Sequence, residues 1–529
     1  MTPSFPAPDA ARASLTPAPS DVVAPVHRRL FGSFVEHMGR TVYTGIFEPG
    51  HPTADEDGFR TDVLELVREL GVTVVRYPGG NFVSGYRWED GVGPVAERPT
   101  RLNLAWHSTE PNTFGLGEFM RWAERAGIEP MMALNLGTRG VAEALDVLEY
   151  CNHPGGTALS DLRAAHGSPH SYGVRMWCLG NEMDGPWQLG HLTAAEYGRL
   201  AAETARGMRQ FDPQLELVAC GSSGRSMPTF GAWEETVLSE AYDLVDHISA
   251  HAYYQLDGDD LPRFLASSLD LADFLDDVTV RADRVAARLG SPKRMSISLD
   301  EWNVWYLKEH TARMASDPPA GWPVAPRLSE DDYTVADAVV VGSMLITLLR
   351  RADRVTAACL AQLVNSLGAI RTEPGGPAWR QSIFHPFAQT AAAAQGWVLR
   401  GDVCGPLVPA GDRGDVPAVD AVVTWHPGDD GSDEGAPDGP RVAVFAVNRS
   451  VTGTVPLEVD LSAFPGLRLR RATLLQDDDW RAANTMAAPG RVAPRPHPDA
   501  ALDGRVLRAA LPPVSWNVLE LSGAGRSAG

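Results

Sequence analysis

The stretch from Val174 to Gly185 reads VRMWCLGNEMDG, and the stretch from Arg294 to Trp305 reads RMSISLDEWNVW. Each joins a short apolar run, typical of a buried β-strand, to an acidic motif, which places Glu182 and Glu301 where parallel strands end. Glutamates so far apart in the chain can meet only if both strands belong to one continuous or closed sheet. Paired carboxylates suit glycoside hydrolysis, in which one protonates the leaving oxygen and the other attacks the sugar or activates water. The first hypothesis is therefore a retaining glycosidase.

Apolar runs alternate with helical patterns on both sides of these motifs. The segment Asp62 to Leu70 has helical spacing and stops at Gly71, and an apolar run follows it directly. The same rhythm gives eight strand–helix repeats, with strands expected in LFGSFVE, VTVVRYP, MMALNL, VRMWCLG, LELVACG, DHISAHAYY, RMSISLDE and VTAACLAQLV. We therefore predict an α/β fold, a (β/α)8 barrel rather than an open doubly wound sheet.

A polar residue lies at the end of each expected strand. In chain order these residues are Glu36, Asn81, Asn135, Glu182, Ser222, Tyr253, Glu301 and Gln362. Barrel enzymes build their active sites at the C-terminal ends of the strands, so this ring is expected to surround the site.

The pattern changes after about residue 395. Short β-like runs separated by Gly-, Pro- and Asp-rich stretches predict a C-terminal antiparallel β-sandwich over residues 396–529. Residues 22–395 would form the catalytic barrel, and the Pro- and Ala-rich residues 1–21 a flexible lead-in. The segment His426 to Pro440 predicts a solvated loop.

Composition narrows the class of protein. With 46 Lys and Arg against 67 Asp and Glu, the formal net charge is −21, which argues against nucleic acid or an anionic membrane as partner. The 5 cysteines show no CxxC pair, and neither a signal peptide nor a long apolar run is apparent, so we expect a reduced, cytoplasmic protein. No GxSxG, P-loop or HExxH pattern and no metal-ligand spacing is found, so no metal or cofactor is expected.

The roles of the two glutamates depend on their surroundings. As a general acid, Glu182 must keep its proton near neutral pH, which needs burial or a nearby charge such as that of Glu301. The alternative is that Glu182 pairs with an arginine or caps a helix, and Asp184 is a competing carboxylate two residues further out. Because strand neighbours face opposite ways, either Glu301 or Asp300 points into the site, and Asp300 stays open as the nucleophile.

Three polar residues near these motifs could hold a sugar. The amide of Asn181 could bind the sugar 2-hydroxyl, a contact that strengthens in the transition state, or the residue could simply form a turn. Glu36 in SFVEHMGR and Asn81 in RYPGGNF could hold hydroxyl groups, although each could equally be an ordinary loop residue.

Aromatic residues form a second set of candidates. Tyr253 in HAYYQ could donate a hydrogen bond to the nucleophile and keep it ionised. His251, two positions earlier, is expected to be a core or supporting residue and not to take part directly in the chemistry. Trp106, Trp302 and Trp305 could present flat faces to sugar rings, but most tryptophans are core residues, and only Trp305 is expected to do so.

The motifs GSFVEHMGR, RYPGGNFVSGYRWEDGVGP, EYCNHP, WCLGNEMDGPWQLGH, DEWNVWY and LAQLVN, in this order, resemble glycoside hydrolase family 51, the intracellular α-L-arabinofuranosidases. The resemblance covers nearly the whole chain. It implies a retaining, exo-acting enzyme that releases terminal arabinofuranosyl residues from arabino-oligosaccharides by double displacement, without metal or organic cofactor. It also implies a sandwich of jelly-roll type and, in many members, a hexamer.

The family pattern transfers to individual positions. It implies that Glu182 is the acid/base and Glu301 the nucleophile. The positions that match arabinose-binding or pocket-shaping residues are Glu36, Asn81, Asn181, Tyr253, Trp305 and Gln362. The N-terminal extension and the acidic loop at Asp429 to Asp438 depart from the family, but both lie far from the site motifs.

Two rival functions remain at this stage. One is the same chemistry on another glycoside, as in a β-xylosidase or an endo-β-glucanase. The other is a non-catalytic sugar-binding protein, which would be expected to lack one of the two carboxylates. The sequence leaves open the linkage, the natural oligosaccharide, activity on doubly substituted xylose and the number of subunits.

Overall fold

A computed structural model describes residues 12–428 and 439–523 of this chain. Eight parallel strands close into a barrel in the order β10-β11-β12-β3-β4-β7-β8-β9, which confirms the predicted fold. Every strand lies inside or across one of the predicted apolar runs. They are β3 (Gly32–Phe34), β4 (Val74–Tyr77), β7 (Glu129–Ala133), β8 (Met176–Leu179), β9 (Glu216–Ala219), β10 (His247–Tyr254), β11 (Ser296–Val304) and β12 (Val355–Leu360).

Helices surround the barrel because their apolar faces pack on the strands. The first, α1 (Thr61–Leu70), buries Val63, Leu64, Leu66, Val67 and Leu70, and it ends at Gly71, which has a φ of 79°. The other helices are α2 (Leu116–Ala126), α3 (Val141–Asn152), α4 (Ala158–Ala165), α5 (Ala194–Phe211), α6 (Ala232–Ala241), α7 (Leu261–Leu265), α8 (Ser267–Leu289), α9 (Leu307–Ser316), α10 (Val335–Arg350) and α11 (Phe384–Ala393). Among the described helices, none has both the length and the apolar character that crossing a bilayer requires.

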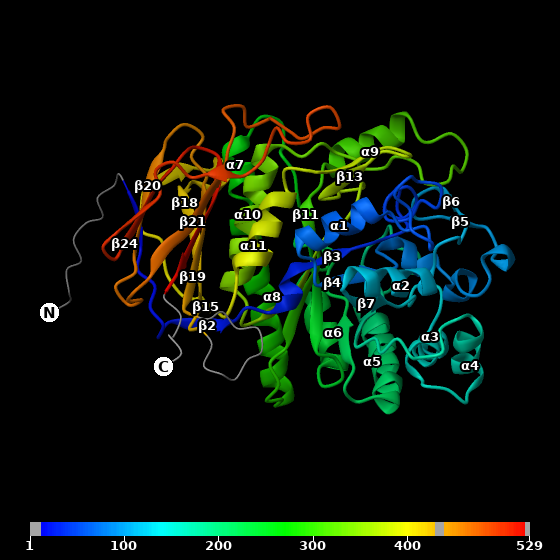
Figure 1. The fold of residues 1–529 in the computed structure, drawn as a ribbon. Coiled ribbons are helices and arrows are strands. Elements are labelled where there is room, and N and C mark those ends of the chain that lie inside the picture. The colour runs from blue at the N-terminus through cyan, green and yellow to red at the C-terminus, as the bar shows by residue number, and fades with distance from the viewer. Residues whose placement is uncertain (1–11, 429–438, 524–529) are drawn as a thin grey trace, which may run out of the picture.

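The second domain is built on two large sheets (Figure 1), beside which β16 (Leu407–Pro409) and β17 (Asp415–Pro417) form a small antiparallel pair. One has the order β1-β20-β24-β23 and the other β2-β15-β18-β19-β25-β21-β22. Their strands are β1 (Ala13–Leu15), β2 (Val22–Pro25), β15 (Trp397–Leu399), β18 (Val419–His426), β19 (Arg441–Asn448), β20 (Val455–Asp460), β21 (Arg468–Leu475), β22 (Arg495–Pro496), β23 (Ala501–Asp503), β24 (Val506–Leu511) and β25 (Ser515–Ser522). All pairings are antiparallel except that of β1 with β20, which is parallel.

The N-terminal segment differs from the expected flexible lead-in. Strand β1 lies along β20 with Ala13 and Leu15 buried, and β2 pairs with β15, so residues 13–25 belong to the sandwich. A strand of three residues is too short to reveal its alternation in a Pro- and Ala-rich stretch. Residues 1–11 and most of the acidic loop, residues 429–438, lie outside the described residues.

Helix α10 lies between the barrel and the sandwich (Figure 1) and contacts β18, β19 and β25. A Cβ at Gly342 of this helix would approach the Trp516 ring to 2.4 Å, so only glycine allows the close packing. Trp516 and Phe445 of the sandwich belong to the same buried cluster as the residues around the barrel. One buried cluster therefore continues from the barrel into the sandwich, which also has a second hydrophobic core of its own.

Candidate active site

Glu301 lies in the second half of β11 and points into the mouth of the barrel. Its Oε2 accepts a hydrogen bond of 2.7 Å from the Tyr253 hydroxyl, and its Oε1 accepts one of 2.8 Å from Arg76 Nη1. Both carboxylate oxygens of Glu301 therefore have a donor that fixes their orientation. The neighbouring Asp300 is fully buried, and its closest charged contacts are His251 Nε2 at 3.2 Å and Arg76 Nε at 3.6 Å. Glu301, rather than Asp300, therefore faces the site.

Glu182 follows β8 and has a φ of 44°, a left-handed conformation that is uncommon outside glycine. Only 9% of the residue is exposed. Its Oε2 accepts a hydrogen bond of 2.6 Å from Trp187 Nε1, and its Oε1 lies 2.9 Å from His251 Nδ1. Burial raises the pKa of Glu182; His251 opposes this shift, and the charge of Glu301 adds to it. A carboxyl with a raised pKa can hold the proton that a general acid must deliver.

His251 joins the three carboxylates of the site. It stands opposite Glu301 in the register of β10 and β11, and its ring contacts Glu182 on one side and Asp300 on the other. Burial alone would lower the pKa of His251, but the surrounding carboxylates, with Glu301 first, raise it well above the usual value. His251 is thus a buried residue that contacts the carboxylates of the site, which agrees with the predicted supporting role.

One group of potential metal ligands is found among the described residues. A carboxylate oxygen of Glu182, one of Glu301 and a ring nitrogen of His251 all lie within 4.8 Å of one another. The sequence showed no such spacing, because the three residues come from three different strands. A histidine with a raised pKa carries protons on both nitrogens, so it donates to the carboxylates instead of offering a lone pair to a cation.

Glu36 and Gln362 form one wall of the site. Glu36 is 2% exposed, and its Oε1 accepts hydrogen bonds from the Phe82 backbone N–H at 2.8 Å and from Trp106 Nε1 at 2.7 Å. Gln362 Oε1 accepts the Glu36 backbone N–H at 3.0 Å. Burial raises the pKa of Glu36 to about 8, so this carboxyl is mostly protonated at neutral pH. Trp106, which we had set aside, lies in this wall.

Arg76 organises the opposite side of the site. Its Nη2 donates to Asn181 Oδ1 at 2.8 Å while its Nη1 holds Glu301. Because arginine only donates, the amide oxygen of Asn181 must face it, which leaves the NH2 group for other partners. That group has only long contacts, 3.3 Å to Gln188 and 3.4 Å to Asn81. The Asn181 amide is therefore oriented and available to a ligand.

Tyr253 and Trp305 pack edge to face with 5.0 Å between ring centroids. The Tyr253 hydroxyl reaches Glu301, and Trp305 Nε1 donates to Ser329 Oγ at 3.1 Å. Both rings are partly exposed and line a cleft of about 880 Å³ that also contains Glu182 and His251. A second cleft, of about 1160 Å³, adjoins it and shares Asn81 and the half-exposed Trp187. Glu182 is thus reached from an open cleft, and the Tyr253 hydroxyl connects that cleft to Glu301.

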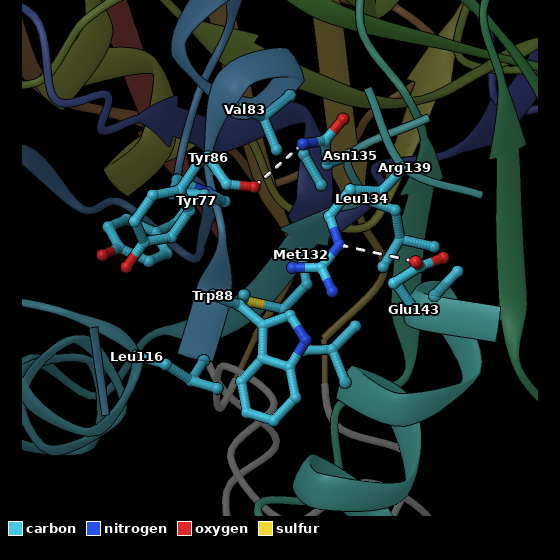
Figure 2. A pocket seen from close by; sticks show the side chains of 14 residues that line it. Tyr77, Val83, Tyr86, Trp88, Leu116, Met132, Leu134, Asn135, Arg139 and Glu143 are labelled. Carbon is cyan, nitrogen blue, oxygen red and sulfur yellow. Dashed lines mark hydrogen bonds and ion pairs between the residues drawn. The ribbon is translucent and has the colours of Figure 1, made fainter. Parts of the chain in front are cut away.

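Two residues of the predicted polar ring do not join this group. Asn135 bonds the Tyr86 carbonyl at 2.8 Å and lines a small apolar cavity of about 30 Å³, where Figure 2 shows it beside Leu134 and Arg139. The Ser222 backbone N–H donates to Glu234. Trp302 is fully buried, in line with its expected place in the core. The other six ring residues and Asn181 surround the site.

Arg76 and Trp187 were missed from the sequence. Arg76 interrupts the apolar run VTVVRYP, and a charged residue in a barrel strand was the available signal. Trp187 lies five residues after Glu182 in the quoted motif and is 54% exposed, which is unusual for tryptophan. Nothing in the sequence indicates that these side chains contact Glu301 and Glu182.

Comparisons with known proteins agree with this geometry. The chain matches the family models of the α-L-arabinofuranosidase 1 domain over residues 66–280 and of the α-L-arabinofuranosidase C-terminal domain over residues 300–515. An intracellular exo-α-(1→5)-L-arabinofuranosidase of Streptomyces lividans is 58% identical over 96% of this chain and 74% of its own. An exo-α-(1→6)-L-arabinofuranosidase of Bifidobacterium longum is 53% identical over 94% and 95%. A solved family 51 α-L-arabinofuranosidase from Bifidobacterium longum has a TM-score of 0.90 and 48% identity, over 96% of this chain and 99% of its own.

Proposed function

Since the chain belongs to glycoside hydrolase family 51, the α-L-arabinofuranosidases, we propose that it works by a retaining double displacement with Glu182 as acid/base and Glu301 as nucleophile. The enzyme is an exo-acting α-L-arabinofuranosidase, which removes terminal non-reducing arabinofuranosyl residues. The β-xylosidase, endo-β-glucanase and binding-protein alternatives lose their support, because the relatives that cover nearly the whole chain are named for arabinofuranosides.

The closeness of the two carboxylates carries the proposal. An oxygen of Glu182 and one of Glu301 lie within 4.8 Å of each other. In retaining enzymes the carboxyl groups are about 5–5.5 Å apart, whereas inverting enzymes need about 6.5–9.5 Å to admit a water molecule. The spacing supports direct attack by Glu301.

The two displacement steps are carried out by the two glutamates. Glu301 attacks the anomeric carbon while Glu182 gives its proton to the departing oxygen, which forms an arabinosyl ester and frees the alcohol. Glu182, now ionised, takes a proton from water, whose oxygen displaces Glu301 and releases arabinose with net retention. Tyr253 and Arg76 hold the Glu301 carboxylate in place through the hydrogen bonds described above.

The sugar contacts follow from the free donors and acceptors. The Asn181 NH2 group can bind the 2-hydroxyl, and the protonated carboxyl of Glu36 can both donate to and accept from other hydroxyls. Asn81 and Gln362 offer amides on either side, and the ring of Trp305 shapes the pocket. We assign these five residues and Tyr253 to substrate binding. The proposed mechanism needs no cofactor.

The test is hydrolysis of p-nitrophenyl α-L-arabinofuranoside by wild type, Glu301→Ala and Glu182→Ala, each with and without azide. Loss of the acid/base should lower the rate by about 10²- to 10⁴-fold, and loss of the nucleophile should leave only background. Azide should partly rescue Glu182→Ala and give an arabinosyl azide of retained configuration, because azide attacks the ester without needing a base. A retained-configuration azide from Glu301→Ala, in place of Glu182→Ala, would mean that the roles of the two glutamates are exchanged.

Asp184→Asn is the matched control. This carboxylate belongs to the same motif, but it accepts hydrogen bonds from the Ser223 backbone N–H at 3.0 Å and from the Thr229 hydroxyl at 3.1 Å, away from the reacting groups. It should keep most of the activity. If the xyloside or a β-glucan were cleaved in place of the arabinofuranoside, the sugar assignment would fail while the carboxylate roles stood.

The relatives' names suggest the setting of the reaction. We propose a cytoplasmic enzyme acting on short arabino-oligosaccharides, because several relatives at 47–58% identity are named intracellular. Linkage is not settled by identity, since relatives at 58% and 53% are named for 1→5 and 1→6 bonds. We also propose a homo-hexamer on family resemblance, to be tested by light scattering. We assign catalysis to the barrel, which the sequence placed at residues 22–395. Strands β1 and β2, within residues 13–25, belong with the sandwich of residues 396–529.

A further inference from the structure

Trp305 is held by a polar contact outside the sugar pocket. Its indole Nε1–H donates to Ser329 Oγ at 3.1 Å, and the same hydroxyl lies 2.9 Å from His310 Nδ1 on helix α9. Burial lowers the pKa of His310, so the neutral imidazole can accept the Ser329 proton through Nδ1. The direction of donation therefore runs from Trp305 through Ser329 to His310.

Ser329 is placed for this contact at a conformational cost. It is fully buried and has a φ of 48°, a left-handed conformation that serine rarely adopts. Its carbonyl accepts the Leu367 backbone N–H at 2.8 Å, in the segment that follows Gln362. A non-glycine residue persists in such a conformation only when its surroundings over-determine it, and such residues cluster at active sites.

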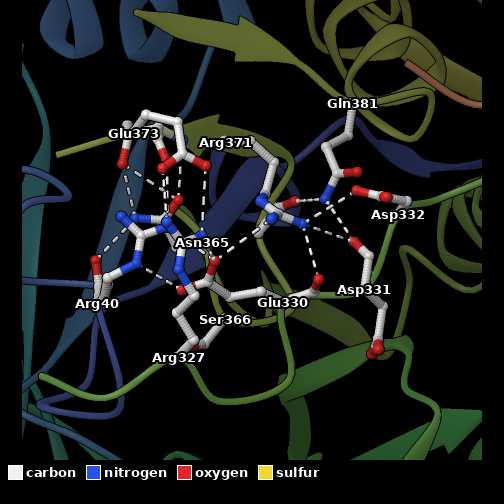
Figure 3. A network of polar contacts seen from close by, with 12 residues as sticks. Arg40, Arg327, Glu330, Asp331, Asp332, Asn365, Ser366, Arg371, Glu373 and Gln381 are labelled. Carbon is white, nitrogen blue, oxygen red and sulfur yellow. Dashed lines mark hydrogen bonds and ion pairs between the residues drawn. The ribbon is translucent and has the colours of Figure 1, made fainter. Parts of the chain in front are cut away.

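The surroundings that hold Ser329 begin with the next residue. Glu330 is buried, and its carboxylate accepts two hydrogen bonds of 2.7 Å from Arg40, one of 3.1 Å from Arg327 and one of 3.3 Å from Arg371. Figure 3 shows the three guanidinium groups converging on this carboxylate. We call Glu330 with these three arginines the Glu330 cluster.

The Glu330 cluster ties together three segments that carry site residues. Arg40 follows Glu36 on the loop after β3, and its carbonyl accepts Asn365 Nδ2 at 2.9 Å, three residues after Gln362. Arg371 Nη1 donates to the Glu330 carbonyl at 2.8 Å. The loop that ends at Ser329 is therefore fixed to the loops bearing Glu36 and Gln362.

We propose that Ser329 is a positioning residue of the active site: its hydroxyl orients the Trp305 indole against Tyr253, and the Glu330 cluster holds Ser329 where it can do so. The inference rests on the proposed role of Trp305 in shaping the sugar pocket. Ser329 would act through successive contacts: its hydrogen bond with Trp305, the packing of Trp305 on the Tyr253 ring, and the hydrogen bond from Tyr253 to Glu301.

The decisive variant is Ser329→Gly, because glycine accepts the left-handed conformation and removes only the side chain. We expect kcat/KM for p-nitrophenyl α-L-arabinofuranoside to fall roughly three- to tenfold, mainly through KM, since one hydrogen bond and the orientation of a binding ring are lost. Ser329→Ala, if it folds, should show the same fall in kcat/KM as Ser329→Gly. Ser366→Ala, which removes another fully buried hydroxyl from the same region, should stay within about twofold of wild type.

A double-mutant cycle separates positioning from general packing. Trp305→Phe keeps a ring but loses the N–H that Ser329 accepts. If Ser329 acts through Trp305, adding Ser329→Gly to Trp305→Phe should change kcat/KM by less than about twofold. Effects that multiply in the double variant, or a Ser329→Gly enzyme with wild-type KM, would overturn the proposal.

A measurement that does not depend on activity tests the positioning role of Ser329 even if the proposed function is wrong. In protein labelled with 5-fluorotryptophan, Trp305→Phe identifies the Trp305 fluorine resonance, which Ser329→Gly should shift and Ser366→Ala should not. Glu330→Gln should shift it as well, whereas Asp332→Asn, at the exposed partner of Arg371, should not. If Glu330→Gln lowers thermal stability but leaves the Trp305 resonance in place, the claim that the Glu330 cluster positions Ser329 is wrong. If Ser329→Gly leaves the resonance in place, the claim that Ser329 orients Trp305 is wrong.

Discussion

At the scale of single residues, the proton on Glu182 is set by opposing neighbours. Burial and the charge of Glu301 raise the pKa of Glu182, while the imidazolium of His251, 2.9 Å away, lowers it. The general acid works only while protonated, so activity in kcat/KM falls as pH rises through this pKa. The position of the alkaline limb of the pH profile therefore reports the balance between His251 and Glu301.

His251→Asn tests this balance. Asparagine can keep a donor near the place of Nδ1 but carries no charge, so the pKa of Glu182 should rise and the alkaline limb should move to higher pH. Loss of a charge-assisted hydrogen bond, worth about 1.5–3 kcal/mol, should also lower kcat roughly 10- to 100-fold. His247→Asn is the control, because His247 lies on the same strand at the other end, where burial lowers its pKa to about 4 and keeps it neutral. If the alkaline limb of His251→Asn stays in place or moves to lower pH, His251 does not lower the pKa of Glu182.

At the scale of elements, the barrel strands could be predicted because each overlaps a short apolar run, and some follow a helix that ends at a glycine, as at Gly71 and Gly127. The same logic located Glu182 and Glu301, since a strand end is visible in the sequence. Strand β1 could not be predicted, because its three residues are stabilised by pairing with β20, more than 400 positions away. The role of Arg76 was missed for a related reason. Its strand was recognised, but the partners of its side chain lie just after β8 and on β11. Local patterns predict elements, and contacts between distant elements decide the details of the site.

Strand β1 should contribute measurably to stability. Leu15 is 2% exposed in the sandwich core, so Leu15→Ala should cost about 2–5 kcal/mol by removing buried methyl groups and leaving a cavity. The neighbouring Ser14 is exposed on the same strand, and Ser14→Ala should change stability by less than about 0.5 kcal/mol. Thermal unfolding of both variants measures the difference, and kcat should be unchanged in each because β1 is far from the barrel mouth. Equal melting temperatures for the two variants would mean that β1 is not docked in solution.

At the scale of the whole molecule, Asp420 connects the sandwich to the barrel through buried charges. It is 4% exposed, and its carboxylate pairs with Arg449 of the sandwich and with Arg350 of helix α10. Arg449 Nη2 also donates to Ser268 and Ser343 of the barrel helices, both at 2.9 Å. Because one buried cluster also continues from the barrel into the sandwich, we expect the two domains to unfold in a single calorimetric transition.

Asp420→Asn should lower the temperature of that transition, because the buried guanidinium of Arg449 and the partly exposed one of Arg350 then lack a counter-charge. Leaving the buried charge unpaired should cost about 3–5 kcal/mol. Burial opposes ionisation of Asp420, but Arg350 and Arg449 hold its pKa below the usual value. A depressed pKa stabilises the fold above the unfolded pKa of about 3.9, and this stabilisation is lost as pH falls through the folded value. The gap between wild type and Asp420→Asn should thus be full from about pH 5 upward and narrow below about pH 4. Asp412→Asn, at an exposed pair with Arg263, should show almost no gap at any pH. A gap for Asp420→Asn that ignores pH would mean that packing, and not the buried charge, joins the two domains.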